Sequence, residues 1–112
     1  MHEMAIAEGI LDIALRYAKD NDASKIAEVG LAIGELSGVE SESLLFCWES
    51  ITADSAAEGA RLVLRRVPLR GCCRECSFEA KIEKLNFICP RCGGTMELVQ
   101  GRELKVEYLE VD

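Results

Sequence analysis

Two cysteine pairs within one short segment place the strongest constraint on how this chain can fold. The segment "CCRECSFEAKIEKLNFICPRCGG" holds Cys73 and Cys76 as one C-x2-C and Cys89 and Cys92 as a second, twelve residues further on. Each C-x2-C turn can direct two thiolates at one point, and two such turns complete a tetrahedral S4 site for zinc. The spacing therefore predicts a zinc-ribbon module with a structural metal, because four protein ligands leave no open position for catalysis.

The two remaining cysteines leave one alternative open. Cys72 could replace Cys73 as the first ligand, in a C-x3-C pair, although the tighter spacing is the usual one. A redox C-x2-C of thioredoxin type would need a βαβ setting that the sequence lacks. Cys47 shares an apolar helical stripe with Leu44 and Trp48, so we expect it to be a core thiol.

Hydrophobic periodicity around the cysteine segment predicts two helices and three strands. Residues 4–19 carry a wide apolar stripe in which Ile13 and Tyr17 continue the spacing begun by Ile6. A second helix is expected within residues 35–51, with Ser37 or Ser41 as its N-cap. Alternating apolar residues predict strands in three segments: 25–34, 61–67 and 103–111.

This order of elements predicts an α+β fold in which two helices pack on a three-stranded sheet, with a small zinc-ribbon module inserted before the last strand. We expect residues 1–68 plus 102–112 to form the helix-and-sheet domain and residues 69–101 to form the zinc-binding module. The apolar pieces of that module are too short to bury a core of their own, so its folding should depend on the metal.

Charge is distributed unevenly along the chain and leaves one alternative function open. Residues 61–105 hold ten Lys and Arg against five Asp and Glu, whereas the rest of the chain holds three against fifteen. A zinc-ribbon nucleic-acid-binding adaptor is therefore the alternative. Its phosphate contacts would come from Arg65, Arg66, Arg70, Arg74, Lys81, Lys84 and Arg91. Against it stand the net charge of −7 and the few aromatic residues available for base stacking, Phe78 and Phe87.

Several classes of function do not fit the sequence. The only histidine is at position 2 and no Gly-rich phosphate loop is present, so we expect no enzyme. No apolar run approaches 18 residues, and the first residues lack the basic and apolar regions of a secretory signal. Clustered cysteines without an export signal indicate a reducing compartment, so a cytoplasmic location is expected.

The first three residues, Met1, His2 and Glu3, can form a second metal site of different chemistry. A free α-amine, deprotonated backbone amides and a neutral imidazole can surround one ion with nitrogen donors. Such tetragonal sites favour Cu(II) or Ni(II) over zinc. The alternative is an ordinary terminus without function. The predicted first helix begins directly afterwards and would anchor the chelate.

Taken together, "MHE" at the start, the two C-x2-C turns at these offsets and the order of elements resemble the HypA family of nickel metallochaperones. The resemblance covers the whole chain, and Cys72 beside Cys73 is the visible oddity. It implies a nickel site at Met1, His2 and Glu3 and a structural zinc at the four cysteines of the two turns. It also implies delivery of nickel to the [NiFe]-hydrogenase large subunit together with a HypB-type GTPase. Glu40, expected in the first turn of the second helix, is a candidate acid beside the nickel ligands.

Overall fold

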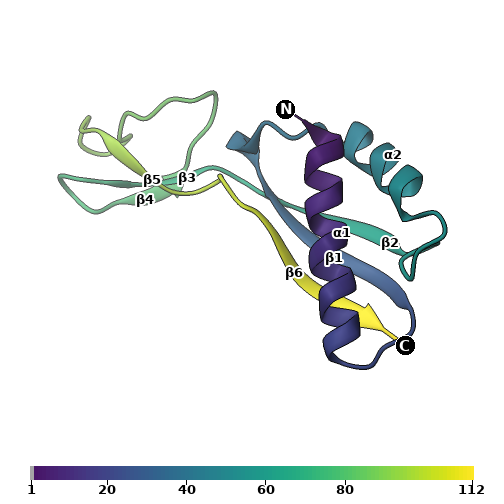
Figure 1. The fold of residues 1–112 in the computed structure, drawn as a ribbon. Helices are drawn as coiled ribbons and strands as arrows, with labels where there is room; N and C mark the ends of the chain where they lie inside the picture. Colours follow the sequence, from purple (N-terminus) through teal and green to yellow (C-terminus); the bar gives the residue numbers. More distant parts are fainter. Residues whose placement is uncertain (1) are drawn as a thin grey trace. The chain divides into compact units, whose positions relative to one another are not determined.

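The computed structural model describes residues 2–112, so Met1 lies outside the described residues (Figure 1). The elements in chain order are α1 (Glu3–Asp20), β1 (Ile26–Gly34), the short 3-10 helix η1 (Glu35–Ser37), α2 (Ser41–Thr52), β2 (Arg61–Val67), β3 (Arg70–Cys73), β4 (Glu79–Lys81), β5 (Met96–Gln100) and β6 (Leu104–Val111).

Contacts within the chain divide it into two compact units. The helix–sheet unit consists of Met1–Ala32, Gly38–Arg65 and Lys105–Asp112, and the cysteine unit consists of Ile33–Ser37 and Arg66–Leu104. The predicted α+β class is confirmed, with two helices, a three-stranded sheet and a separate four-cysteine segment. No helix among residues 2–112 is both long and apolar enough to cross a membrane.

Helix α1 buries its alanine-rich side. Ala7, Ile10, Ala14 and Ala18 are buried, and α1 packs against α2. The predicted stripe was therefore too wide, because Ile13 and Tyr17 on its flank are 52% and 47% exposed. The periodicity of the sequence identifies every apolar position of the helix, but only part of the apolar stripe is buried in the fold.

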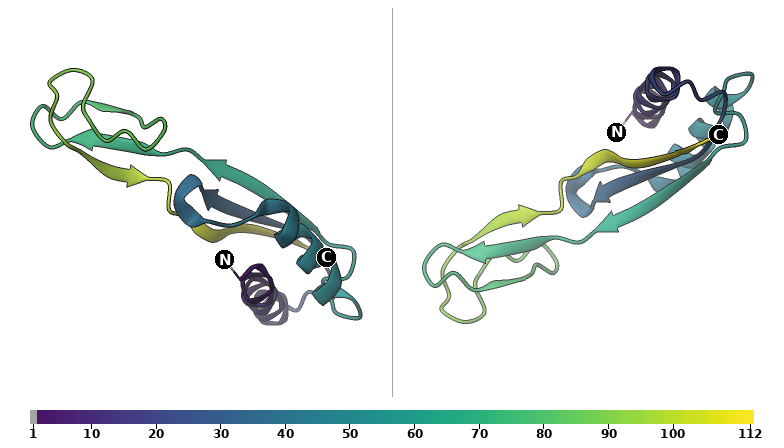
Figure 2. Two further views of the ribbon diagram at one scale, coloured as in Figure 1. Left: turned by 90° about the horizontal axis from the view of Figure 1, so that it is seen from above. Right: turned by 90° about the horizontal axis from the view of Figure 1, so that it is seen from below.

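Strand β1 is the centre of the helix–sheet unit, between β2 and β6 (Figure 2). Every residue of β1 except Ala27 is buried, although alternation predicted only one buried face. On one face Tyr108 of β6 lies over Gly30, where any side chain would overlap its ring. The Tyr108 hydroxyl donates to the buried Glu28 carboxylate at 2.6 Å, and Arg61 forms an ion pair with the same carboxylate. The hydrogen bond to Glu28 raises the pKa of Tyr108.

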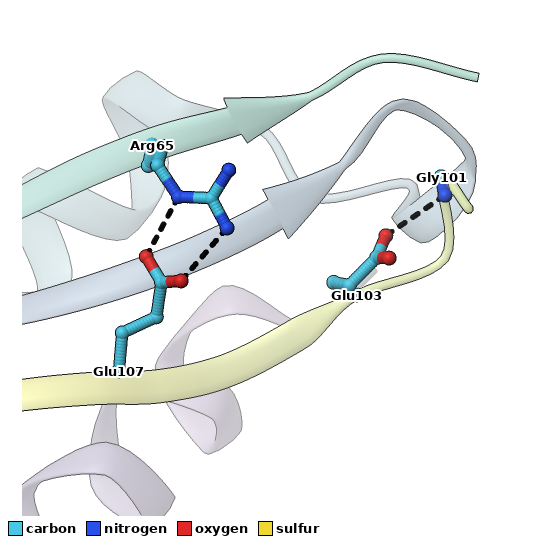
Figure 3. A network of polar contacts seen from close by, with 4 residues as sticks. All are labelled: Arg65, Gly101, Glu103 and Glu107. Carbon is cyan, nitrogen blue, oxygen red and sulfur yellow. Dashed lines mark hydrogen bonds and ion pairs between the residues drawn. The ribbon is translucent and has the colours of Figure 1, made fainter. Parts of the chain in front are cut away.

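A bidentate ion pair links the two strands that flank β1. Arg65 of β2 donates from Nε and Nη2 to the Glu107 carboxylate of β6, at 2.9 and 2.7 Å (Figure 3). Planar two-point contacts of this kind fix geometry as well as charge. The hydrogen bonds from Arg65, more than its charge, lower the pKa of Glu107. The pair therefore connects β2 and β6 across β1.

Helix α2 begins later than predicted. Residues Glu35–Ser37 form η1, and α2 starts at Ser41 with Glu40 as its N-cap, so neither Ser37 nor Ser41 caps it. The Glu40 carboxylate accepts the Glu42 N–H at 3.0 Å. Glutamate is a less usual N-cap than serine, which is why the sequence pattern favoured the wrong residue.

The cysteine unit contains a second three-stranded sheet that the sequence did not predict. Its antiparallel order is β4-β3-β5, with Gly71 opposite Ala80 and Leu98. In the part of the cysteine unit that includes residues 33–37, the backbone N–H of Gly34 donates to the Glu103 carbonyl and that of Leu36 to the Gly101 carbonyl, each at 2.7 Å. The Glu103 carboxylate accepts the Gly101 N–H at 2.8 Å (Figure 3). Residues 33–37 are thereby bound to the segment that follows β5.

We expect Gly30→Ala to destabilise the helix–sheet unit by about 1–3 kcal/mol, because the new methyl group displaces the Tyr108 ring. Gly9→Ala is the matched control, since nothing lies within 4 Å of its Cβ position in α1. This change should instead stabilise the chain by about 0.5–1 kcal/mol. Urea unfolding of the zinc-loaded proteins measures both, and equal stability of the two variants would contradict the packing of Tyr108.

Glu107→Gln should lower the free energy of unfolding more at pH 7 than at pH 3. The pKa of Glu107 is lowered in the folded state, so its contribution exists above the ordinary carboxyl range and is lost as the pH falls through the folded pKa. Denaturant unfolding at both pH values checks this. Glu110→Gln, an exposed change on the same strand, should show no such pH dependence.

Candidate metal centre

Four cysteine sulfurs converge at one point in the cysteine unit. The Sγ atoms of Cys73, Cys76, Cys89 and Cys92 all lie within 4.8 Å of one another. Cys73 and Cys92 are 3.4 Å apart, and Cys76 and Cys89 are 3.7 Å apart. Tetrahedral zinc with Zn–S bonds of about 2.3 Å requires sulfur separations of about 3.8 Å. The structure thus brings the four predicted ligands together at a spacing that fits zinc.

Backbone N–H groups of both turns point at the sulfurs. In the first turn, Glu75 and Cys76 donate to the Cys73 sulfur at 3.4 and 3.5 Å. In the second, Arg91 donates to the Cys89 sulfur at 3.4 Å. The second turn is closed by the Gly93 N–H, which donates to the Cys89 carbonyl at 2.9 Å. Such donors stabilise sulfur in its charged form.

The pKa shifts of these thiols differ in direction from one cysteine to the next, because backbone N–H groups and neighbouring sulfurs act in opposite senses. The Cys76 N–H, with that of Glu75, lowers the pKa of Cys73. Burial raises the pKa of Cys89, but the N–H groups of Cys92 and Arg91 outweigh it and hold that pKa at about 6. For Cys92 the Gly94 N–H favours the thiolate, yet the neighbouring cysteine sulfurs raise its pKa to about 12. Four like charges this close together require a cation.

Gly94 contributes to the site, although sequence reasoning did not single it out. A Cβ at this position would lie 3.4 Å from the sulfurs of both Cys73 and Cys92 and 2.8 Å from Cγ of Glu75. Its carbonyl also accepts the Cys89 N–H at 2.7 Å. The second glycine of "CPRCGG" was the available signal, because a glycine directly beside two ligands often marks a close approach.

The other two cysteines are not part of the four-sulfur group. Cys72 precedes the ligand Cys73 in sequence, but its thiol lies 3.7 Å from the Ser77 carbonyl oxygen and is not one of the four converging sulfurs. Cys47 is half-buried in α2. The open alternative, in which Cys72 replaces Cys73, is not the arrangement that the described residues adopt, because Cys73 supplies the fourth converging sulfur.

The predicted nickel residues lie at the start of α1. His2 is exposed and is the N-cap of α1, and its carbonyl accepts the Ile6 N–H at 3.1 Å. Glu3 is the first residue of the helix. Met1, the third predicted ligand, lies outside the described residues.

Glu3 connects this terminus to the start of α2. Its carboxylate accepts the Glu40 N–H at 3.0 Å, and this hydrogen bond lowers the pKa of Glu3. Glu40 therefore meets the N-terminal residues through its backbone, while its own carboxylate caps α2. Glu40 is the N-cap and not a residue of the first turn. It lies beside Glu3 as expected, but through its backbone N–H and not through its carboxylate.

Comparison with known proteins gives a consistent result. Residues 1–111 match the family described as "Hydrogenase/urease nickel incorporation, metallochaperone, hypA". Two relatives, each named "Hydrogenase maturation factor HypA", come from Albidiferax ferrireducens and Azotobacter vinelandii. They are 39% and 42% identical to this chain over 113 residues, and each match covers both chains completely.

A solved structure shares the fold. The solution structure of the Ni metallochaperone HypA from Helicobacter pylori superposes with a TM-score of 0.69 at 25% sequence identity. The match covers 99% of this chain and 97% of the other. The same fold is thus found in a solved protein of similar length.

We expect the purified chain to hold one zinc ion, and Cys89→Ala to lose it, because removing one ligand opens the S4 site. Cys72→Ala is the matched control and should retain zinc in full. Metal analysis by mass spectrometry measures both. Loss of zinc from the Cys72→Ala protein would move the first ligand from Cys73 to Cys72.

Proposed function

The chain belongs to the HypA family of hydrogenase and urease nickel-incorporation metallochaperones, and we propose that it binds Ni(II) at its N-terminus and delivers it for maturation of [NiFe]-hydrogenase. The observation that carries the proposal is the position of His2. It is the N-cap of α1, between the terminal residue and the first helical residue, Glu3. An imidazole at that point stands beside the amine and amide nitrogens that a nickel chelate needs.

The proposed nickel ligands are the Met1 amine, the His2 amide nitrogen and imidazole, and Glu3. Helix geometry supports a backbone contribution, because the first N–H groups of an α-helix have no acceptor within the helix. The Glu3 carboxylate already accepts the Glu40 N–H. We therefore favour the Glu3 backbone nitrogen over its carboxylate as the ligand, with the carboxylate positioning the terminus against α2.

The four converging cysteines are proposed to hold zinc in a structural role. Their sulfur separations suit a tetrahedral S4 site, and the N–H donors favour thiolates. Zinc bound there would cross-link the cysteine unit. Its four protein ligands would leave no open coordination position. The chain's own residues then do the work of a carrier, which needs binding and release of nickel and no turnover chemistry.

The proposed partners are a HypB-type GTPase and the hydrogenase large subunit, and the proposed location is the cytoplasm. The names of the relatives, hydrogenase maturation factors, support the hydrogenase partner. The GTPase is what the family resemblance implies, and the location is the one expected from clustered cysteines. A nickel site that includes the exposed His2 suits transfer, because a partner can reach the ion without unfolding the carrier. This is why we propose a carrier and not an enzyme.

His2→Ala should abolish tight nickel binding and leave the zinc content unchanged. An N-terminal extension of two residues should do the same, because it removes the amine from its place beside His2. Isothermal titration at pH 7.5 measures the nickel affinity, and metal analysis measures the zinc. Stoichiometric nickel in the His2→Ala protein would falsify the assignment.

Nickel affinity of the unaltered chain should also fall steeply between about pH 7.5 and 6, because protons compete for amine and imidazole nitrogens in this range. Repeating the titration at three pH values checks the dependence. An affinity that stays constant down to pH 6 would indicate carboxylate ligands in place of nitrogen.

A further inference from the structure

A groove of the helix–sheet unit has no part in either metal site. It lies between α2 and the beginning of β2 and has a volume of about 890 Å³. It is lined by residues of α2, of the loop before β2 and of β2. Among them are Leu45, Phe46, Glu49, Glu58, Leu62 and Val63. All of them are more than 40 residues from the proposed nickel ligands in sequence and belong to one compact unit.

The groove includes the free edge of a sheet. Strand β2 is the outer strand in the order β2-β1-β6. Leu62 is buried and its neighbour Val63 is 40% exposed, and successive strand residues point to opposite faces. A groove lined by both residues therefore contains the strand backbone between them. Outer strands present unpaired N–H and C=O groups, which are templates for another extended chain.

The walls of the groove are fixed before anything binds. The Trp48 indole N–H donates to the Ala60 carbonyl at 3.0 Å and ties α2 to the residue that precedes β2. Thr52, in the last turn of α2, donates its hydroxyl to the Trp48 carbonyl at 2.8 Å. On the rim, Phe46 is 73% exposed. A preformed apolar site of this kind avoids much of the ordering cost of binding.

The uncompensated charge of the groove is negative. Glu49 and Glu58 line it, and the sequence of α2, "SESLLFCWESIT", has no basic residue. Arg61 also lines the groove, but it is paired with the buried Glu28 carboxylate. An apolar anchor with neighbouring Lys or Arg would therefore complement this surface, and an acidic segment would be repelled.

We propose that this groove binds an extended, basic segment of a partner protein, which adds as a fourth strand beside β2. Its apolar side chain lies against Leu45 and Phe46, and its basic side chains face Glu49 and Glu58. A second copy of β2 is a poorer occupant, because its Arg61 and Arg65 are already paired with Glu28 and Glu107 and are not available to Glu49 and Glu58. The same two ion pairs offset the positive charge that β2 presents to a basic segment. The inference does not depend on the nickel site.

The test uses the zinc-loaded, ¹⁵N-labelled full chain and the capped peptide Ac-Lys-Val-Lys-Val-Lys-Val-NH2. We expect chemical-shift changes confined to α2, the loop that follows it and β2, residues 41–67, and slower hydrogen exchange of β2 amides when the peptide is added. The same peptide with Glu in place of Lys should bind at least tenfold more weakly. A version with proline at the central valine should also lose affinity, because proline cannot continue a ladder.

Two pairs of variants locate the site. Phe46→Ser should weaken the lysine peptide at least tenfold, whereas Ile13→Ser, an exposed apolar change on α1 outside the groove, should not. Glu49→Gln should weaken it about threefold and reduce its salt dependence, whereas Glu42→Gln on the same helix should have no effect.

Three results would overturn the proposal: no binding of the lysine peptide at millimolar concentration, equal binding of the glutamate peptide, or shift changes mainly outside residues 41–67. Concentration-dependent shifts of β2 amides without peptide, with a dimer in sedimentation, would also overturn it and make a second copy the occupant.

Discussion

The convergence of four cysteine sulfurs within 4.8 Å of one another is the constraint on which the cysteine unit depends. The buried cluster around the sulfurs contains Cys73, Cys89 and Met96, with Phe78 and Ala80 partly buried beside it. So small a cluster cannot offset the conformational entropy of ordering the two turns. Two of its three buried members are themselves cysteines of the site. Structure and metal binding are therefore one equilibrium there, since the proposed zinc stabilises only the folded arrangement.

The two proposed metal sites use different donor atoms and lie in different units of the chain. Thiolates suit zinc, whereas amine, amide and imidazole nitrogens in a tetragonal arrangement suit Ni(II). The site at the cysteines is saturated by its own protein ligands, and the proposed site at the terminus is open to a partner. Glu3 gives the terminal site its connection to the fold, because its carboxylate holds the Glu40 N–H at the start of α2. A cargo site can be exposed and still be positioned in this way.

Local patterns were sufficient for part of this structure. The strand at 61–67 and the helix predicted at 4–19 are observed as Arg61–Val67 and Glu3–Asp20, because periodicity is a property of neighbouring residues. Ligand spacing likewise predicted which cysteines converge. The sheet β4-β3-β5 was missed because strands of three to five residues carry too little alternation to detect. The contact of Tyr108 with Gly30 joins distant positions, and no local signal reports it. The domain boundaries at 69 and 101 stay predictions.

The central claim is that nickel binds to nitrogen at the terminus while the cysteines stay with zinc. Nickel K-edge X-ray absorption on the zinc-loaded chain with one equivalent of Ni(II) tests it most directly. The account predicts a first shell of nitrogen and oxygen neighbours without a nickel–sulfur path, and a zinc edge that keeps four sulfur neighbours. Sulfur in the nickel shell, accompanied by loss of sulfur from the zinc shell, would contradict it and place the cargo at the four cysteines.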